Sequence, residues 1–430
     1  MPRDTRVVLE HERIPRSGIH PARLARLQAL DERQAGRSGQ TVLDWGRRAE
    51  VCARNYVGVL QVPGLTVEIL PKVVTVERPS PEDRLLARRN LLYMLGYTNR
   101  LPVRRRDLAD LDVHRFSLLE AFICVFAERL VTELGRGMNH AYVRREEDVT
   151  FVRGRILFEE QARRSAVHRE RVAVAYDDYL PDTDLNRVLR AGCERLLVLS
   201  RSVRAQRALR TCMLQFAEVS AVHVEAEHAE RVVLNRNSER FRPLLDFCWL
   251  LLAGRSPAPG VGETGSFSLL FPMESVFEQF IAGFLVAHAR SLGLEPGRVH
   301  CQAKGRSRWL VRDEGGEQDF RLRPDIVIDD HHGGTLTVLD TKWKVLGRDP
   351  FDSRQGVAEA DLYQLHAYAR QYGAPNNVLL YPVTAASRPR TYAVEGAEHH
   401  RLRVAFVDVS RDLSRSREAT VTDLRDAVLA

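Results

Sequence analysis

Two apolar, strand-like runs joined by a Gly-Gly turn constrain the fold of this chain more than any other feature. The runs cover residues 323–328 and 336–342, and each is too short and too β-branched for a helix. If the turn centres on His332-Gly333, the register places Asp325 directly opposite Asp340. Cross-strand Cβ atoms are about 4.5–5.5 Å apart, so both carboxylates could reach one ion.

Two bare carboxylates at that spacing repel each other, and a divalent cation resolves the conflict. Mg²⁺ suits them, with Mn²⁺ as an alternative, because it takes one or two carboxylates together with water and phosphate oxygens. Lys342 lies two residues beyond Asp340, on the same face of the strand. Its ammonium could orient or help deprotonate a water that attacks a phosphodiester. The competing interpretation is a surface hairpin in which Asp340 and Lys342 form an ordinary exposed ion pair.

Lysine is rare in this chain, which gives each lysine more weight. The 430 residues include 60 arginines and only four lysines, which are Lys72, Lys304, Lys342 and Lys344. A guanidinium stays protonated, whereas an ammonium has a tunable pKa, so a lysine among so many arginines indicates a site that needs that property. Lys344 shares the strand face of Lys342, where it either contacts phosphate or remains a solvated side chain at the rim.

Charge and missing motifs exclude several functions. The formal net charge is +7, with +6 in residues 1–100 and −1 in residues 251–430. The N-terminal excess is compatible with nucleic acid or an acidic partner. The sequence has no P-loop motif, so we expect no nucleotide binding of that type. Without an apolar run of 18 residues, a signal-type start or paired cysteine spacings, it predicts a soluble cytoplasmic protein that does not bind membranes.

The patterns along the chain predict a multidomain protein of the α+β or α/β class. Residues 1–80 alternate in a strand-like way and predict a small β-rich module. Residues 81–253 predict a mainly helical middle domain with one short strand pair. Residues 254–266 are rich in Gly and Pro and predict a linker. Residues 267–430 show a helix-strand-helix-strand order, typical of a mixed sheet flanked by helices.

The hairpin resembles the PD-(D/E)xK nuclease motif, here Pro324-Asp325 and Asp340-Thr341-Lys342. That resemblance implies a restriction-endonuclease-like fold in residues 267–430. It also implies that Asp325, Asp340 and Lys342 are catalytic, and that the two acids bind the metal together with the backbone carbonyl of Thr341.

Two flanking helices extend the resemblance. Glu278 lies on the preceding helix, where many such nucleases carry an acid, although a solvent-facing helix acid is the competing interpretation. Gln364 and Tyr368 resemble the Q-x-x-x-Y element of these enzymes, and their spacing places them on one helix face. By resemblance, Glu278 and Gln364 join the catalytic group.

Further motifs, in order along residues 56–383, resemble the McrC family. They are Tyr56–Val62 with Val67–Lys72, Arg89–Leu95, Val152–Ile156, Asp177–Tyr179 with Asp184–Arg187, Phe271–Glu278 and Leu379–Pro382. McrC proteins are the nuclease subunits of McrBC-type, modification-dependent restriction systems. The resemblance implies a Mg²⁺-dependent endodeoxyribonuclease that cuts double-stranded, modified DNA in antiviral defence.

The resemblance also implies a partner, an McrB-like hexameric AAA+ GTPase that recognises methylated DNA and translocates. The N-terminal part would dock into the ring and stimulate GTP hydrolysis, while the C-terminal part cuts. The basic region 1–100 is then a docking surface or, alternatively, a DNA-contacting face. Two other functions remain open: a stand-alone DNA or RNA nuclease, and a non-catalytic adaptor that only activates the motor. An adaptor has no use for Asp325, Asp340 and Lys342 together.

Overall fold

A computed structural model of the chain divides into two compact units. The first unit comprises residues 1–99, 103–119 and 256–430, and the second comprises residues 100–102 and 120–255. The second unit is therefore an insertion in the chain of the first. The structure describes residues 4–73, 79–98, 116–163, 170–253, 266–344, 346, 356–383, 387–397 and 399–429. The linker predicted at 254–266 lies outside these residues except for its last position.

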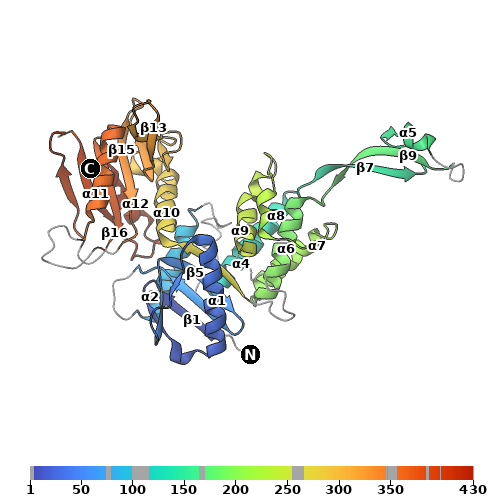
Figure 1. Cartoon of the computed structure of the whole chain (residues 1–430), viewed down its shortest axis with the longest axis horizontal. Coiled ribbons are helices and arrows are strands. Elements are labelled where there is room, and N and C mark those ends of the chain that lie inside the picture. The colour runs from blue at the N-terminus through green and yellow to red at the C-terminus, as the bar shows by residue number, and fades with distance from the viewer. Residues whose placement is uncertain are drawn as a thin grey trace. The chain divides into compact units, whose positions relative to one another are not determined.

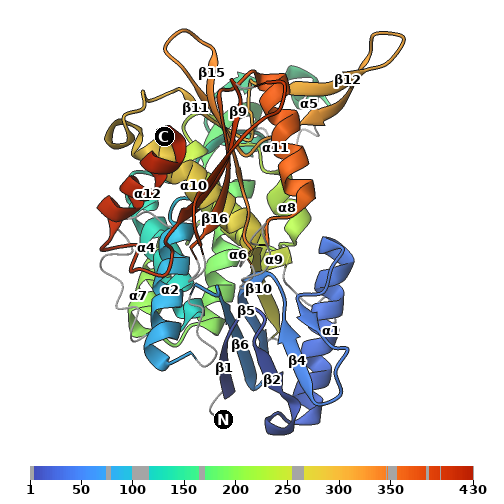
Figure 2. The same ribbon diagram turned by 90° about the vertical axis from the view of Figure 1, so that its left-hand side faces the viewer.

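A four-stranded sheet of order β1-β6-β5-β10 forms the N-terminal part of the first unit (Figure 1). Its strands are β1 (Asp4–Leu9), β6 (Leu65–Leu70), β5 (Tyr56–Val62) and β10 (Phe267–Pro272). Strands β5 and β6 form the predicted hairpin, and Gly64 at its turn has a φ of 82°, in the left-handed region that glycine tolerates. Every residue of β6 is buried, because α1 (Pro21–Ser38) and α2 (Pro81–Leu95) lie on opposite sides of the sheet (Figure 2).

Strand β10 is an unexpected member of this sheet. The predicted nuclease domain, residues 267–430, includes residues 267–272, but β10 pairs with β5, from Phe267 opposite Gln61 to Pro272 opposite Tyr56. The chain then enters α10 (Met273–Ala287) directly, and the Met273 amide donates to the Asn55 carbonyl at 3.0 Å. The N-terminal sheet and α10 are therefore continuous.

A small sheet and its apolar core complete the N-terminal part. Its strands are β2 (Arg13–Pro15), β4 (Glu50–Ala53) and β3 (Leu43–Asp44), with a short 3₁₀ turn at Arg16–Gly18. Leu27 and Leu30 of α1 pack against Leu60 and Val67 of the larger sheet in a shared hydrophobic cluster. Burial of these side chains, each worth about 1.5–3 kcal/mol, anchors the helix.

The C-terminal part of the first unit is a six-stranded mixed sheet of order β11-β14-β15-β16-β18-β17. Its strands are β11 (Val299–Cys301), β14 (Ile326–Asp329), β15 (Thr335–Thr341), β16 (Asn376–Pro382), β18 (Arg401–Val407) and β17 (Arg390–Ala393). Strands β15, β16 and β18 run parallel, and the others pair antiparallel. Helices α11 (Glu359–Tyr372) and α12 (Arg417–Leu429) lie on opposite sides of this sheet (Figure 2).

The predicted strand-like run 323–328 is only in part a strand. Strand β14 begins at Ile326, and Pro324, which has no N–H to donate to a sheet, separates it from β13 (Gln318–Leu322). Strand β13 pairs with β12 (Arg308–Arg312) in a separate two-stranded ribbon. A 3₁₀ turn at Ala289–Leu292 follows α10.

The second unit is mainly helical and carries a three-stranded sheet. Its helices are α4 (Leu118–Gly135), α5 (Phe158–Ala162), α6 (Asp184–Leu199), α7 (Val203–Gln215), α8 (Ala226–Arg231) and α9 (Arg242–Ala253), with a 3₁₀ turn at Glu239–Phe241. The predicted strand pair near 140–158 corresponds to β7 (Ala141–Val149) and β8 (Arg155–Ile156). Both pair with β9 (Val172–Leu180), which was not predicted, and β7 and β9 form an arm beyond the helices of this unit (Figure 1).

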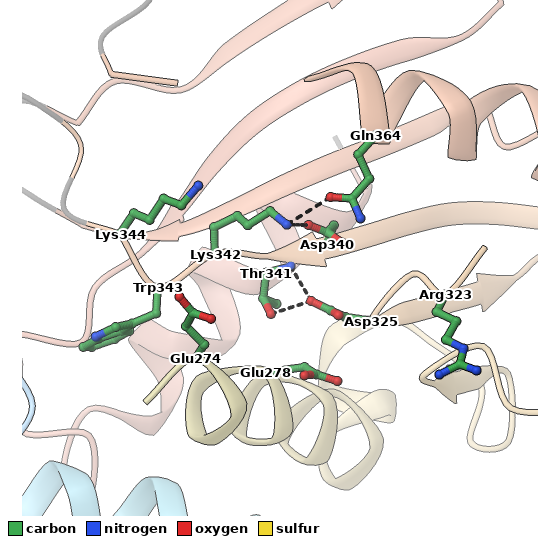
Figure 3. A pocket seen from close by; sticks show the side chains of 10 residues that line it. All are labelled: Glu274, Glu278, Arg323, Asp325, Asp340, Thr341, Lys342, Trp343, Lys344 and Gln364. Atoms are coloured by element: carbon green, nitrogen blue, oxygen red, sulfur yellow. Dashed lines mark hydrogen bonds and ion pairs between the residues drawn. The ribbon is translucent and has the colours of Figure 1, made fainter. Parts of the chain in front are cut away.

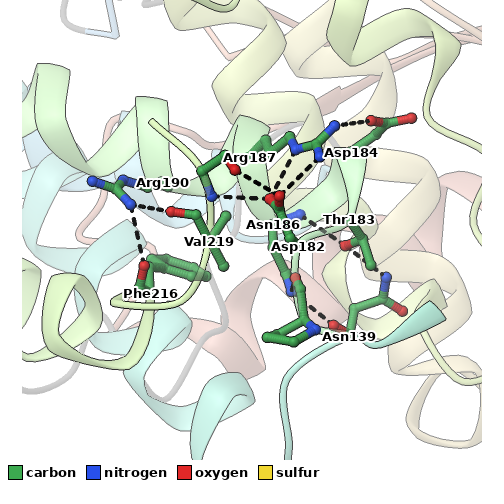
Figure 4. Close-up of polar contacts among 11 residues, drawn as sticks. Asn139, Asp182, Thr183, Asp184, Asn186, Arg187, Arg190, Phe216 and Val219 are labelled. Atoms are coloured by element: carbon green, nitrogen blue, oxygen red, sulfur yellow. Dashed lines mark hydrogen bonds and ion pairs between the residues drawn. The ribbon is translucent and has the colours of Figure 1, made fainter. Parts of the chain in front are cut away.

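The motif Asp184–Arg187 has a structural role in the second unit (Figure 4). The buried Asn186 amide donates to the carbonyls of Asn139 and Pro181, both at 2.7 Å. Arg187 makes two hydrogen bonds to Asp182, at 2.8 and 2.9 Å, which hold the pKa of that carboxyl well below its usual range. These bonds join the start of α6 to the end of β9.

These observations show a mixed α/β chain with several sheets. Within the described residues, no helix is both long enough and apolar enough to cross a lipid bilayer. All six cysteines are free thiols, and Cys124, Cys193, Cys212 and Cys248 are buried.

Candidate active site

The β14–β15 hairpin aligns the two predicted acids. Ile326 pairs with Leu339 and Val327 pairs with Val338, a register that places Asp325 opposite Asp340 as predicted. The turn itself is longer than the predicted two-residue reversal. The Asp330 carboxylate accepts hydrogen bonds from the amides of residues 332 and 334, and a register shift after Ile328 compensates for the difference. The alignment of the acids is therefore unchanged.

All six predicted site residues line one cavity of about 390 Å³ (Figure 3). They are Glu278, Asp325, Asp340, Thr341, Lys342 and Gln364. Glu274, Arg323, Trp343 and Lys344 line the same cavity. Helix α10 supplies the two glutamates, the β14–β15 hairpin and the residues that follow it supply the acids and lysines, and α11 supplies the glutamine.

Thr341 holds Asp325 in place. Its amide and its hydroxyl both donate to Asp325 Oδ2, at 2.7 and 2.6 Å. Burial and the nearby charge of Glu278 raise the pKa of Asp325 to about 6, although the two bonds from Thr341 oppose the shift. Asp325 is therefore a fixed carboxyl in a site that disfavours its ionised form.

Asp340 lies in the same environment. Its side chain is almost fully buried, and burial together with the charge of Asp325 raises its pKa to about 6. Lys342 Nζ lies 2.7 Å from Asp340 Oδ2 and only partly offsets that repulsion. The pair carries more negative charge than its protein surroundings neutralise, which is the condition that a bound cation relieves.

Lys342 is held by acids and an amide. Its Nζ donates to Gln364 Oε1 at 3.1 Å and lies 4.0 Å from Asp361 Oδ1, in addition to its contact with Asp340. Burial disfavours the ammonium, but the charges of Asp340, Asp361 and Asp325 outweigh it and raise the pKa of Lys342. Lys342 is thus a cation at neutral pH, which favours an orienting and charge-stabilising role over that of a general base.

Asp361 is a site residue that sequence reasoning missed. It lies in the first turn of α11 and is buried, and its Oδ2 accepts from Lys344 Nζ at 3.0 Å and from the Tyr381 hydroxyl at 3.1 Å. Lys344 therefore has an acidic partner. The spacing of the sequence could have identified Asp361, because it precedes Gln364 by three residues and shares its helix face.

The predicted Gln364–Tyr368 pair also makes contact. Gln364 Nε2 donates to the Tyr368 hydroxyl at 2.8 Å, while its Oε1 accepts from Lys342. Tyr368 is buried against β14 and β15 in a cluster with Val327 and Val338. A buried tyrosine thus orients the amide that positions the lysine.

Glu278 and Glu274 form the helical wall of the cavity. Glu278 is half-buried and its Oε1 accepts from Gln302 Nε2 at 3.1 Å, so it is not a freely solvated helix acid. The backbone N–H of Gln302 donates to the Asp325 carbonyl at 2.5 Å, so Gln302 links α10 to the first acid. Glu274 lies one turn earlier on the same face.

The donor set of the cavity fits Mg²⁺. Within the described residues, no group of three or more His, Cys, Asp or Glu side chains is placed to hold a metal ion. Mg²⁺ needs no such group, because it commonly binds one or two carboxylates and keeps its remaining positions for water and phosphate oxygens. Asp325 and Asp340 supply two mutually repelling carboxylates. The Thr341 carbonyl, between Asp340 and Lys342 in the sequence, is the further oxygen ligand that the sequence predicts.

The fold and this cavity place the chain in a class of mixed α/β proteins with clustered acids and a lysine at the end of a strand. A family model for McrBC 5-methylcytosine restriction system components matches residues 51–382. The chain belongs to that family, and the resemblance to McrC is confirmed.

The fold is similar to that of chains in solved structures from Thermococcus gammatolerans. A chain in the refined half-complex from a tetradecameric assembly of McrB AAA+ hexamers with bound McrC is 21% identical, with a TM-score of 0.70, and the match covers 98% of this chain and 99% of that chain. A chain in the cryo-EM structure of the McrBC complex is 25% identical, with a TM-score of 0.54, over 66% of this chain and 88% of that chain. No curated protein matches the sequence.

Proposed function

We propose that this chain is the Mg²⁺-dependent endonuclease subunit of an McrBC-type restriction complex and hydrolyses phosphodiester bonds in double-stranded DNA. One observation carries the proposal: Asp325 and Asp340 are opposed in one cavity, and Lys342 Nζ lies 2.7 Å from Asp340. The mixed sheet with helices on both faces supports a PD-(D/E)xK arrangement of these residues.

The residues of the cavity divide the chemistry between them. Asp325, Asp340 and the Thr341 carbonyl would hold Mg²⁺, which supplies charge stabilisation and a more acidic water when bound. Lys342 places a positive charge beside the phosphate and stabilises the charge that develops on its oxygens. Gln364 and Asp361 keep that ammonium in place. Glu278 adds an acid at the entrance from α10.

The proposed partner is an McrB-like AAA+ GTPase hexamer. The Thermococcus chains that this protein resembles come from complexes with McrB, and the present sequence has no P-loop of its own. We infer that the partner recognises modified DNA in the cytoplasm and that this chain stimulates its nucleotide hydrolysis.

The structure offers a surface for that partner in the second unit. Large exposed apolar side chains gather on the β7–β9 arm and its flanking loop, where Tyr142 is 75% and Phe151 is 65% exposed. Such a patch on a ribbon with few buried residues fits a protein interface. The basic N-terminal region remains the rival surface, although Arg84 and Arg88 are already paired with Glu12 and Glu68.

The test is cleavage of methylated plasmid by the chain together with its AAA+ partner, GTP and Mg²⁺. We expect cutting that EDTA abolishes and that Asp340→Ala reduces at least about a hundredfold, while Asp313→Asn, which alters an exposed acid between β12 and β13, leaves it intact. Strong cutting without a partner would instead support a stand-alone nuclease. Full GTPase stimulation without any cutting would support the adaptor.

A further inference from the structure

Glu10 is a buried acid that the proposed chemistry does not use. It follows β1 in the N-terminal sheet and is 1% exposed. Its Oε2 accepts from the backbone amide of Lys72 at 3.1 Å, and its Oε1 has no hydrogen-bond partner among the residues that the structure describes. An acid buried in this way is costly, because a polar group removed from water loses its solvation without full compensation.

The second donor to Glu10 comes from the strand end that bears the site. Trp343 Nε1 donates to Glu10 Oε2 at 3.0 Å, and Trp343 lies between Lys342 and Lys344 in the chain. The indole also packs against Phe277 of α10, with ring centroids 5.2 Å apart. Trp343 thus contacts Glu10, at the end of β1, through its N–H, and it contacts Phe277, next to Glu278 on α10, through its ring.

Both walls of the cavity are therefore attached to the N-terminal sheet. One wall is α10, which continues directly from β10. The other is the segment after β15, whose backbone is otherwise held by the bond from the Lys342 amide to the Leu380 carbonyl at 2.9 Å. Beyond Lys342 the strand pairing ends, so the orientation of the next residues depends on side-chain contacts.

We propose that Glu10 is a positioning residue for the nuclease site: by holding the Trp343 indole it fixes the direction in which Lys342 leaves β15, relative to Asp325 and Asp340. This inference rests on the proposed nuclease function. A misplacement of about 1 Å in a catalytic constellation can cost as much as a hundredfold in rate, which makes such a contact worth its burial cost.

The neutral form of Glu10 is compatible with this role. Burial raises the pKa of Glu10 to about 8, more than the bonds from Lys72 and Trp343 lower it. A protonated carboxyl still accepts at one oxygen. Glutamine reproduces that acceptor without the charge and is therefore the conservative replacement.

The chain contains a matched control for this contact. Trp45 Nε1 donates to Asp31 Oδ2 at 2.8 Å, in the same N-terminal part but without contact to the cavity. Trp45→Phe therefore removes the same kind of bond as Trp343→Phe and preserves an aromatic ring in each case. Only the second should affect the site.

The experiment measures cleavage and metal binding in the full chain with its AAA+ partner. We expect Trp343→Phe to lower kcat about tenfold with little change in KM, and to weaken Mn²⁺ binding by calorimetry about tenfold, as losses of supporting contacts do. Glu10→Ala should match it, Glu10→Gln should retain most activity, and the double variant Glu10→Ala/Trp343→Phe should lose no more than either alone. Trp45→Phe should stay within about twofold of wild type.

Several outcomes would overturn the inference. Wild-type kcat and Mn²⁺ affinity in Trp343→Phe would do so, as would losses in the double variant equal to the product of the single losses. Equal losses in Trp45→Phe and Trp343→Phe, in step with their melting temperatures, would show a merely structural role. If the wild type binds Mn²⁺ without cutting DNA, the proposed function fails, and the loss of affinity in Trp343→Phe still decides the inference.

Discussion

Lys344 Nζ forms an ion pair of 3.0 Å with Asp361 Oδ2, while Lys342 Nζ lies 4.0 Å from the other oxygen of the same carboxylate. One buried acid of α11 therefore faces both lysines of the strand end. Asp361 balances the positive charge of the pair and sets how far each ammonium extends into the cavity.

Removing the charge of Asp361 should release both lysines. We expect Asp361→Asn to lower single-turnover DNA cleavage about tenfold, because the Lys342 ammonium loses one of the charges that hold it. The melting temperature should change little, since asparagine still accepts from Tyr381. Asp313→Asn, in an exposed loop, is the control. An unchanged cleavage rate in Asp361→Asn would contradict the assignment.

The two lysines should differ in their tolerance of arginine. Lys342→Arg should reduce cleavage about a hundredfold, because a planar guanidinium does not fit beside Asp340 and Gln364 and cannot reproduce a compact ammonium. Lys344 is exposed, and an arginine in its place can also form an ion pair with Asp361. The cleavage rate of Lys344→Arg should therefore stay within about threefold of wild type. Cleavage assays on both variants check this contrast, and equal losses would count against the role of Lys342.

The paired acids predict a pH dependence of stability in metal-free protein. The pKa values of Asp325 and Asp340 are about 6, above the value of about 3.9 expected in the unfolded chain. The stabilising contribution is therefore complete below pH 4 and lost as the pH rises through 6. Relative to wild type, Asp340→Asn should gain roughly 2–4 °C in melting temperature between pH 4.5 and pH 8. Added Mg²⁺ should stabilise only the wild type.

Asn186 should be important for the second unit but not for chemistry. Asn186→Ala removes the side-chain donor to the Asn139 carbonyl and one of the two donors to the Pro181 carbonyl, and should destabilise the protein by about 2 kcal/mol. Asp184→Ala, at a side chain that is 82% exposed in the same motif, should cost less than about 0.5 kcal/mol. Urea titration of both variants measures the difference, and similar midpoints would show that the motif is not structural.

Aromatic residues of the β7–β9 arm should matter for the partner. Tyr142 and Tyr179 are exposed and have ring centroids 4.8 Å apart. Replacing both by alanine should reduce GTPase stimulation about tenfold or more without lowering the melting temperature, as expected for exposed interface aromatics. Tyr363→Ala, at an equally exposed tyrosine on α11, is the matched control. Full GTPase stimulation by the variant that lacks both tyrosines would instead favour the basic N-terminal region as the surface that contacts the partner.

Local rules were sufficient to predict the register of the β14–β15 hairpin and the shared face of α11. Strand period and turn composition were sufficient to oppose Asp325 and Asp340, even though the turn differs in detail. Helix spacing likewise placed Gln364 and Tyr368 on one face, and they make contact. Short-range periodicity carries this information without knowledge of the rest of the fold.

Long-range partners could not be predicted in the same way. The run 267–272 is apolar, but its pairing with β5, some 200 residues away, leaves no local signal. Glu10 looks like any polar residue after a strand, and its burial arises only when Trp343 and Lys72 meet it. Asp361 in the first turn of α11 already has an ordinary explanation, because acids favour helix N-termini.

The pairing of β10 with β5 has a consequence for how such a nuclease can be exchanged between proteins. A fragment that starts at residue 267 would take a strand out of its sheet and leave the edge of β5 open to aggregation. The second unit, by contrast, is apart from residues 100–102 one continuous stretch of chain, residues 120–255, inserted in the first unit. We therefore expect recombination among relatives to exchange the helical insertion, while the C-terminal sheet is inherited together with the N-terminus.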